Sequence, residues 1–187
     1  MKLLCTTTLI DDFRNSSVFV DSTALIHASK SDDFLTLLTD MVGAGCTFYT
    51  VPSVVYEYTR TANNLKGYEE RLEFIKELGI VVFNRIEELL LKDSKVFLAA
   101  YNTEFKKENG GPSYTDSILC TMVYKHRGSD SYVLTSNHKD MPLSMFDRKE
   151  LITLDISGSF HIEALYQFSE EKFSKVLSKL ESQEAKK

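Results

Sequence analysis

The residues of this chain most suited to chemistry are oxygen-bearing side chains that stand just beyond short apolar runs or near the start of a helical segment. They are Asp21, Glu57, Asp116, Asn137 and Asp140. In an open α/β sheet, ligands bind beyond the carboxyl ends of the strands. If the apolar runs form parallel strands, we therefore expect these side chains to meet at one edge of the sheet.

Several carboxylates at one point repel one another, and a bound cation relieves that repulsion. Carboxylate oxygens, an amide oxygen and waters suit Mg²⁺ or Mn²⁺ better than Zn²⁺. One or two such ions can polarise a phosphoryl oxygen and lower the pKa of a bound water. The residue types therefore indicate metal-dependent phosphodiester hydrolysis, with no serine or histidine nucleophile to form a covalent intermediate.

Two of the acidic residues also have a structural interpretation. Asp21 precedes Ser22 and Thr23 and could cap the helix that they begin. Asp116 lies in the first turn of its helix, where the helix dipole stabilises an acid. Glu57 is flanked by apolar residues, and a lone carboxylate is costly to bury there without compensation. Catalysis and helix capping both stay open for Asp21 and Asp116 at this point.

The elements that must position these residues alternate between apolar runs and helical segments, which is typical of an α/β fold with a mainly parallel sheet. We expect five strands, at Val18–Val20, Cys46–Val51, Ile80–Phe83, Ser131–Thr135 and Leu151–Ile156. The predicted helices include Leu65–Leu78, 89–108, Ser113–His126 and an amphipathic C-terminal helix over about 160–182. No linker or repeat divides the 187 residues, so we expect a single domain with a core over about 16–157.

Composition narrows the class of protein. With 43% hydrophobic and 26% charged residues the chain is not of a disordered type, and no apolar run approaches the roughly 18 residues of a membrane span. Three cysteines without a CxxC pair, and an N-terminus without the apolar stretch of a signal peptide, predict a cytoplasmic protein. The net charge of −5 argues against a broad positive surface for nucleic acid. Since a site of acidic ligands supplies part of that charge, we expect weak RNA affinity without metal.

In their order along the chain, four motifs resemble the PIN-domain nucleases. They are Val-Phe-Val-Asp21-Ser, Pro52-Ser-Val-Val-Tyr-Glu57, Asp116-Ser-Ile-Leu and Leu134-Thr-Ser-Asn137. The resemblance extends from about Val18 to Ile156 and implies a Rossmann-like three-layer α/β/α sandwich around a five-stranded sheet. It also implies a Mg²⁺- or Mn²⁺-dependent endonuclease for single-stranded RNA, with Asp21, Glu57, Asp116 and Asn137 as metal ligands. Many members carry Asp where this chain has Asn137, and Asp140 could supply the missing charge.

The expectation from sequence is therefore a metal-dependent endoribonuclease. Besides the metal ligands and Asp140, the residues assigned to substrate binding are Ser22, Arg60, Thr135 and Lys139. The expected partners are the RNA substrate and, if the chain is a toxin, an antitoxin or other protein, with no membrane. The apolar face of the C-terminal helix would pack on its own sheet or on a second copy in a homodimer. An alternative with the same fold is a catalytically weak or inactive module that binds RNA or protein, and Asn137 keeps that alternative open.

Two further enzyme classes fit parts of the pattern less well. A phosphatase of the haloacid-dehalogenase type also places an aspartate after an apolar strand, but it needs a second acid two residues later, where this chain has Thr23. A nuclease for structured DNA would carry an extra arch or a helix-hairpin-helix element, and the sequence shows no sign of either.

Overall fold

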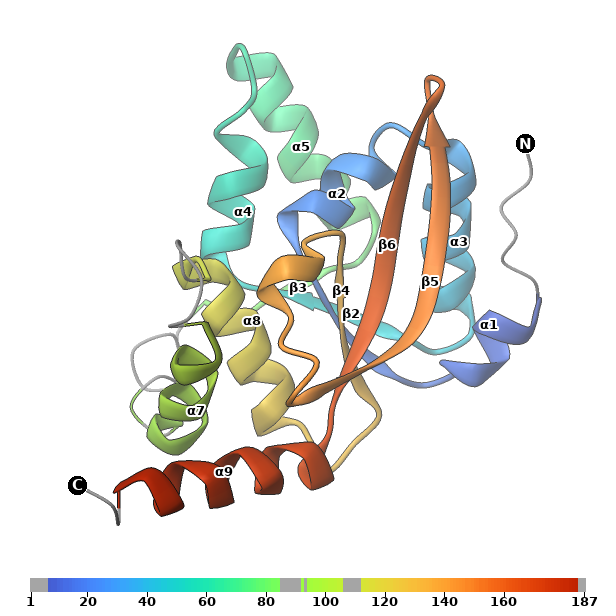
Figure 1. The fold of residues 1–187 in the computed structure, drawn as a ribbon. Coiled ribbons are helices and arrows are strands. Elements are labelled where there is room, and N and C mark those ends of the chain that lie inside the picture. The colour runs from blue at the N-terminus through green and yellow to red at the C-terminus, as the bar shows by residue number, and fades with distance from the viewer. Residues whose placement is uncertain (1–6, 85–91, 93, 106–111, 185–187) are drawn as a thin grey trace.

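The computed structural model describes residues 7–84, 92, 94–105 and 112–184 (Figure 1). These residues build a six-stranded sheet with the strand order β3-β2-β1-β4-β6-β5. The strands are β1 (Ser17–Val20), β2 (Thr47–Thr50), β3 (Val81–Val82), β4 (Ser131–Thr135), β5 (Phe146–Ile156) and β6 (Ser159–Phe168). The α/β class is as predicted, but the sheet is mixed and has six strands in the described residues instead of five mainly parallel ones.

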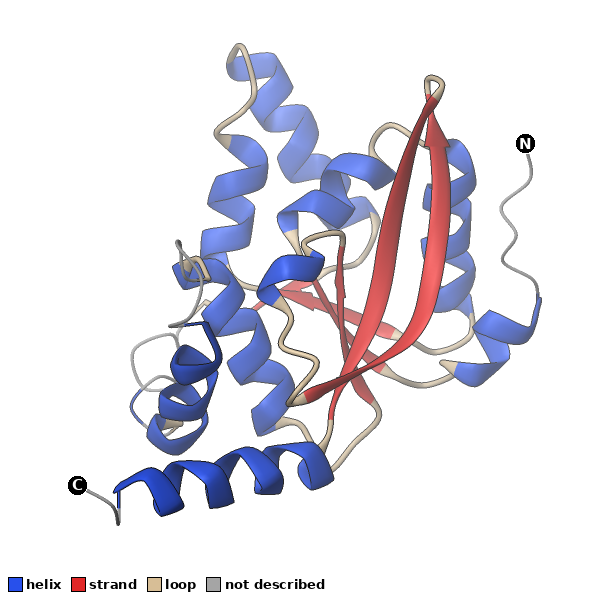
Figure 2. Cartoon of the chain, viewed as in Figure 1, coloured by secondary structure: helices blue, strands red, loops and turns tan. Residues whose placement is uncertain are grey.

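Helices lie on both sides of this sheet (Figure 2). Those before β3 are α1 (Thr7–Asp12), α2 (Ser22–Ala28), α3 (Asp32–Gly43), α4 (Pro52–Thr59) and α5 (Leu65–Glu77). Those after it are α7 (Lys95–Phe105), α8 (Tyr114–Lys125), the short 3-10 helix η1 (His138–Asp140) and α9 (Glu170–Glu184). Of the helix predicted over 89–108, residues 92 and 94–105 lie within the described residues, and Lys95–Phe105 form α7. None of the helices in the described part of the chain combines the length and the apolar content that a membrane span needs.

The parallel half of the sheet sets the position of the candidate residues. Strand β1 pairs in parallel with β2 on one side and with β4 on the other, and Val18 faces Phe48 and Tyr132 in the two registers. The side chains of Val18, Phe19 and Val20 are fully buried because helices cover both faces of this strand. The carboxyl ends of β1 and β4 therefore lie at the same edge, and the backbone N–H of Asp21 donates to the Leu134 carbonyl at 3.1 Å.

The C-terminal region corrects the sequence prediction. Where a helix was expected from about residue 160, the chain forms β6, antiparallel to both β4 and β5, and α9 begins only at Glu170. Ser157 and Gly158 form the two-residue turn between β5 and β6, and both have positive φ, 53° and 83°. Two such residues are typical of the hairpin turn whose twist matches that of paired strands. The Ser-Gly dipeptide between two apolar runs was the sequence signal for this hairpin.

The core under α9 is a group of aromatic rings centred on Phe97 of α7. The Phe97 ring stacks on Tyr124 of α8 at 4.7 Å between centroids and on Tyr101 at 5.7 Å. Phe168 of β6 and Phe173 of α9 complete the contacts, each 6.0 Å from Phe97. The apolar face of α9 therefore packs on aromatic side chains of α7, α8 and β6 in its own chain, and pairing with a second copy stays a prediction.

Candidate carboxylate site

Asp21 is held at the junction of β1, β4 and α2. It is the N-cap of α2, and its Oδ1 accepts a hydrogen bond from the Ser22 backbone N–H at 2.6 Å. Its Oδ2 accepts from the hydroxyls of Thr23 at 2.9 Å and Thr135 at 2.7 Å. Only 4% of the residue is exposed. The capping role considered for Asp21 is therefore present, and the same bonds fix its carboxylate at the edge of the sheet.

Glu57 of α4 is joined to Asp21 through a serine. The Ser22 hydroxyl lies 3.0 Å from Glu57 Oε2 and 3.3 Å from Asp21 Oδ1, so its single proton is shared between two carboxylates. Glu57 Oε1 accepts a hydrogen bond from the Thr115 hydroxyl of α8. Three helices that are distant in sequence are thus linked by hydroxyl groups around one glutamate.

Asp116 belongs to the N-terminal cap of α8. Its Oδ2 accepts from the Ser113 backbone N–H at 3.0 Å and from the Ser113 hydroxyl at 2.6 Å, while its own N–H donates to Ser113 Oγ at 3.1 Å. This reciprocal arrangement is a capping box. Among the described residues, Oδ1 has only a 3.5 Å contact, with Asn137 Nδ2. One oxygen of Asp116 therefore accepts the capping hydrogen bonds of α8, and the other faces the loop after β4.

The loop after β4 brings Asn137 and Asp140 to Asp116. The Asn137 backbone N–H donates to Thr135 Oγ1 at 2.9 Å, and the Asn137 side-chain amide donates to Asp140 Oδ2. The Asp140 carbonyl accepts a hydrogen bond from the Tyr101 hydroxyl at 2.9 Å. The loop thus turns Asp140 inward. The Asn137 amide nitrogen stands between two carboxylates, whereas metal ligation would require its oxygen there.

We call Asp21, Glu57, Asp116 and Asp140 the carboxylate cluster. Burial raises the pKa of Asp21, and the nearby Asp116 charge raises it further against the opposing hydrogen bonds from Thr135 and Thr23. Burial likewise raises the pKa of Asp116, with the Asp140 charge adding to it and the Ser113 hydroxyl opposing. Within the described residues no Lys, Arg or His forms an ion pair with a member of the cluster. Negative charge is therefore concentrated here without a cationic side chain.

The donor set suits a hard divalent cation because it consists of carboxylate and hydroxyl oxygens. In residues 7–84, 92, 94–105 and 112–184, however, no group of three or more His, Cys, Asp or Glu side chains is placed to hold a metal ion. The shell of four protein ligands that the PIN resemblance implies is therefore not assembled. Mg²⁺ is often held by only one or two carboxylates, with waters and phosphate oxygens as its other ligands. The cluster fits that second arrangement.

The residues predicted to bind substrate divide into two pairs. Ser22 and Thr135 are both buried and hydrogen-bonded to members of the cluster. Arg60 is the exposed C-cap of α4, and Lys139 is exposed on η1, where it lines a small pocket of about 220 Å³. Neither cation forms a hydrogen bond or an ion pair with the cluster among the described residues, so the structure does not bring them into it.

Sequence reasoning missed a buried carboxylate beside the cluster. Glu163 of β6 is fully buried, and its Oε1 lies 2.5 Å from His27 Nδ1 of α2. The His27 ring also packs against His161, with 4.4 Å between ring centroids. Burial raises the pKa of Glu163, and the charge of Asp21 raises it further against the hydrogen bond from His27. Because residue 163 was placed on a helix, its position inside the sheet could not be anticipated without the Ser157-Gly158 turn.

Comparisons with known proteins give little to set beside this geometry. No family model matches the chain, and neither does any curated protein. A solved structure found to be similar is TrmN from Thermus thermophilus, with 9% sequence identity and a TM-score of 0.35. The match covers 87% of this chain and 46% of TrmN, so the chain spans less than half the length of that protein.

These results bear differently on two predictions. The resemblance to the PIN-domain nucleases stays a prediction, since no family model matches. The prediction of a metal-dependent endoribonuclease is corrected: the comparison with solved structures gives TrmN. At this TM-score no activity is carried over from TrmN either.

Proposed function

We propose that this chain binds Mg²⁺ or Mn²⁺ at the carboxylate cluster and, through that ion, the phosphate group of a ligand. The observation that carries the proposal is the uncompensated charge of Asp21 and Asp116. Both residues are more than nine-tenths buried, and neighbouring carboxylates raise the pKa of each. A divalent cation would favour the ionised form of both groups and remove the cost of their mutual repulsion.

The ligands of this ion follow from which oxygens are already engaged. Both oxygens of Asp21 accept hydrogen bonds of normal length, and so does Asp116 Oδ2. Within the part of the chain that the structure describes, Asp116 Oδ1 has only its 3.5 Å contact, and Asp140 lies beside it across the Asn137 amide. We therefore assign the ion to Asp116 and Asp140, where it would take the place of the Asn137 amide nitrogen, with Asp21 and Glu57 contributing nearby negative charge.

A phosphate group is the ligand chemistry that suits such an ion. An ion with two carboxylate ligands keeps coordination positions that phosphate oxygens or waters can fill. When bound, the ion would neutralise part of the phosphate charge, which the acidic cluster alone would repel. RNA, the partner predicted from sequence, is one source of such phosphates, and its cleavage is not part of the proposal.

The test is a calorimetric titration of the full chain with Mn²⁺ at neutral pH. We expect saturable binding in the wild type, a loss of about tenfold or more in affinity for Asp116→Asn, and wild-type affinity for Asp40→Asn. Asp40 is a matched control because it is an exposed aspartate on α3 that forms no hydrogen bond with the cluster among the described residues. No saturable binding, or equal affinity in all three proteins, would refute the cation site.

The phosphate step is tested separately by phosphorus NMR of inorganic phosphate. Mn²⁺ bound at the cluster should broaden the phosphate signal in wild-type protein more than in Asp116→Asn protein at the same total Mn²⁺. Equal broadening in the two proteins would leave the ion site without a phosphate ligand and would reject that half of the proposal.

A further inference from the structure

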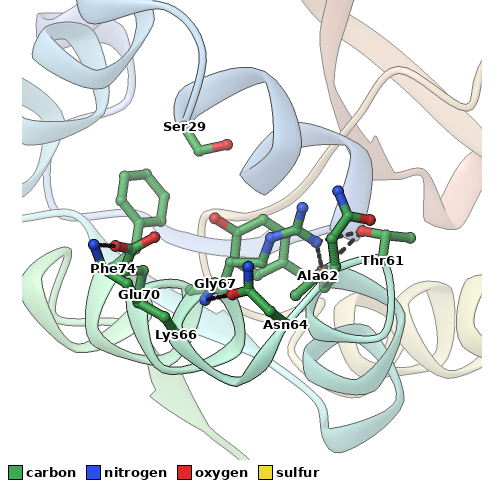
Figure 3. Close-up of a pocket in the computed structure, with 11 residues that line it drawn as sticks. Ser29, Thr61, Ala62, Asn64, Lys66, Gly67, Glu70 and Phe74 are labelled. Atoms are coloured by element: carbon green, nitrogen blue, oxygen red, sulfur yellow. Dashed lines mark hydrogen bonds and ion pairs between the residues drawn. The ribbon is translucent and has the colours of Figure 1, made fainter.

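A second site lies between the ends of α2 and α4 and the start of α5, apart from the carboxylate cluster. It is a pocket of about 590 Å³, within the range of pockets that hold small ligands. Ser29 faces it from α2, and Asn64, Lys66 and Phe74 face it from the α5 side (Figure 3). No member of the carboxylate cluster lines this pocket.

The chemistry of the pocket centres on Arg71 of α5. Its Nη1 donates to the Tyr58 carbonyl and to the Thr61 hydroxyl, which anchors the guanidinium to the end of α4. Its Cζ lies 5.2 Å from the centroid of the Tyr58 ring. A guanidinium has five N–H donors, and both anchoring bonds use Nη1. In the described part of the chain the donors on Nε and Nη2 have no hydrogen-bond partner. This edge is the fork that binds an oxyanion through two parallel hydrogen bonds.

The charge around Arg71 is left positive. Glu70 lines the same pocket but pairs with Lys66, with 3.5 Å between Nζ and Oε1. No carboxylate among the described residues forms an ion pair with Arg71. Asn64 uses its Oδ1 to accept from the Gly67 N–H, which leaves its amide N–H donors for a ligand. The anchored guanidinium is thus a fixed, unpaired cation in a pocket that also offers amide donors.

The same pocket offers aromatic surface. The Tyr58 ring is buried beneath the guanidinium. The centroid of the Phe74 ring lies 6.3 Å from the centroid of the Tyr58 ring. Phe74 is only partly buried. An inorganic anion would fill a small part of 590 Å³ and would leave this surface in contact with water.

The geometry points to a binding site for a small phosphate monoester that carries an aromatic group, such as a nucleoside monophosphate. The phosphate binds the Nε and Nη2 edge of Arg71, and the aromatic group packs against Phe74. The site requires no metal ion, since Arg71 and the Asn64 amide supply the charge and the donors. It is therefore independent of the cation site proposed above.

The test is a titration of the full chain with adenosine monophosphate in buffer that contains EDTA, followed by calorimetry. We expect saturable binding that is weakened about tenfold or more in Arg71→Lys, because lysine keeps the charge and lacks the two-donor fork. Lys76→Met is the matched control, since Lys76 lies on α5 outside the pocket and pairs with Glu73. Adenosine and inorganic phosphate should each bind more weakly than the monophosphate, because adenosine lacks the group that binds Arg71 and inorganic phosphate lacks the group that packs against Phe74.

Two results would overturn the inference. One is equal affinity for adenosine monophosphate in wild type and Arg71→Lys. The other comes from amide NMR of the wild type, which needs no variant to fold. Addition of the monophosphate should shift the amide signals of residues 61–74 and leave those of 113–116 in place. Shifts confined to 113–116, or no shifts at all, would place the ligand elsewhere or exclude it.

Discussion

Replacing Glu163 by glutamine tests how the buried carboxyl behind the carboxylate cluster is protonated. Glu163 is fully buried; one of its oxygens contacts His27, and no hydrogen bond of normal geometry reaches the other within the described residues. The Ser136 hydroxyl is near enough to lower the pKa of Glu163 slightly. Burial is the larger effect and raises that pKa above its ordinary value of 4.5. Glutamine keeps the shape of the side chain and removes the charge.

The sign of the effect follows from proton binding. Below pH 4.5 the carboxyl is protonated in both the folded and the unfolded chain, so the charge of Glu163 does not alter stability there. As the pH rises above 4.5, the unfolded chain releases this proton before the folded chain does. The wild type then loses up to about 1.4 kcal/mol of unfolding free energy per pH unit, until the folded pKa is reached. Glu163→Gln lacks this loss, so its stability relative to the wild type should rise with pH across that window.

Thermal unfolding of both proteins at several pH values above 4.5 measures the difference. For a chain of this length, about 1 kcal/mol corresponds to roughly 2–4 °C in melting temperature. The gap in melting temperature should therefore widen by a few degrees per pH unit in favour of Glu163→Gln. Glu69→Gln, which removes an exposed carboxylate from α5, is the control and should follow the wild type. A gap that widens in favour of the wild type would refute the reasoning, because Glu163 would then stabilise the fold as an ion pair with His27.

Three further predictions concern the aromatic core, the hairpin turn and the metal. Phe97→Ala should cost about 3–5 kcal/mol of unfolding free energy in urea titrations, because it empties the centre of the aromatic group; a loss below about 1 kcal/mol would contradict that packing. Gly158→Ala should cost about 1–2 kcal/mol because φ is +83° there, while Gly128→Ala, at a glycine without positive φ, is its control. Mn²⁺ at a hundredfold excess over its dissociation constant should stabilise the wild type by about 2.7 kcal/mol in thermal unfolding, and EDTA should abolish the gain. A melting temperature that does not change when Mn²⁺ is added would argue against the cation site.

Local patterns predicted much of the parallel half of the fold. The apolar runs at Val18–Val20 and Ser131–Thr135 are strands β1 and β4, and the helix predicted from Ser113 does begin with Ser113 as its cap. These elements depend on short-range features of the sequence. A run of a few apolar residues indicates a strand buried on both faces, and a single capping side chain indicates the start of a helix. The candidate residues Asp21 and Asp116 could be found in the same way, because each stands at an element boundary.

The hairpin shows where periodicity fails. Residues 161–168 carry apolar side chains at spacings that fit a helix, yet they form β6. Pairing with β4 and β5 provides hydrogen-bond partners for the backbone N–H and C=O groups of this segment. It also buries Ala164, Leu165 and Tyr166. Tertiary contacts outweighed the local pattern here, and only the Ser157-Gly158 turn marked the outcome in the sequence.

The sequence by itself determined which residues could carry negative charge to the edge of the sheet, because strand ends and helix starts are local. The tertiary structure decided how those residues meet. The Thr135 hydroxyl reaches Asp21 across 114 positions, and the Ser22 hydroxyl reaches Glu57 across 35. It also decided that Asn137 separates two carboxylates, that Glu163 is buried behind them and that Arg71 lines a separate pocket. Such contacts depend on how distant elements pack, and no spacing along the chain encodes them.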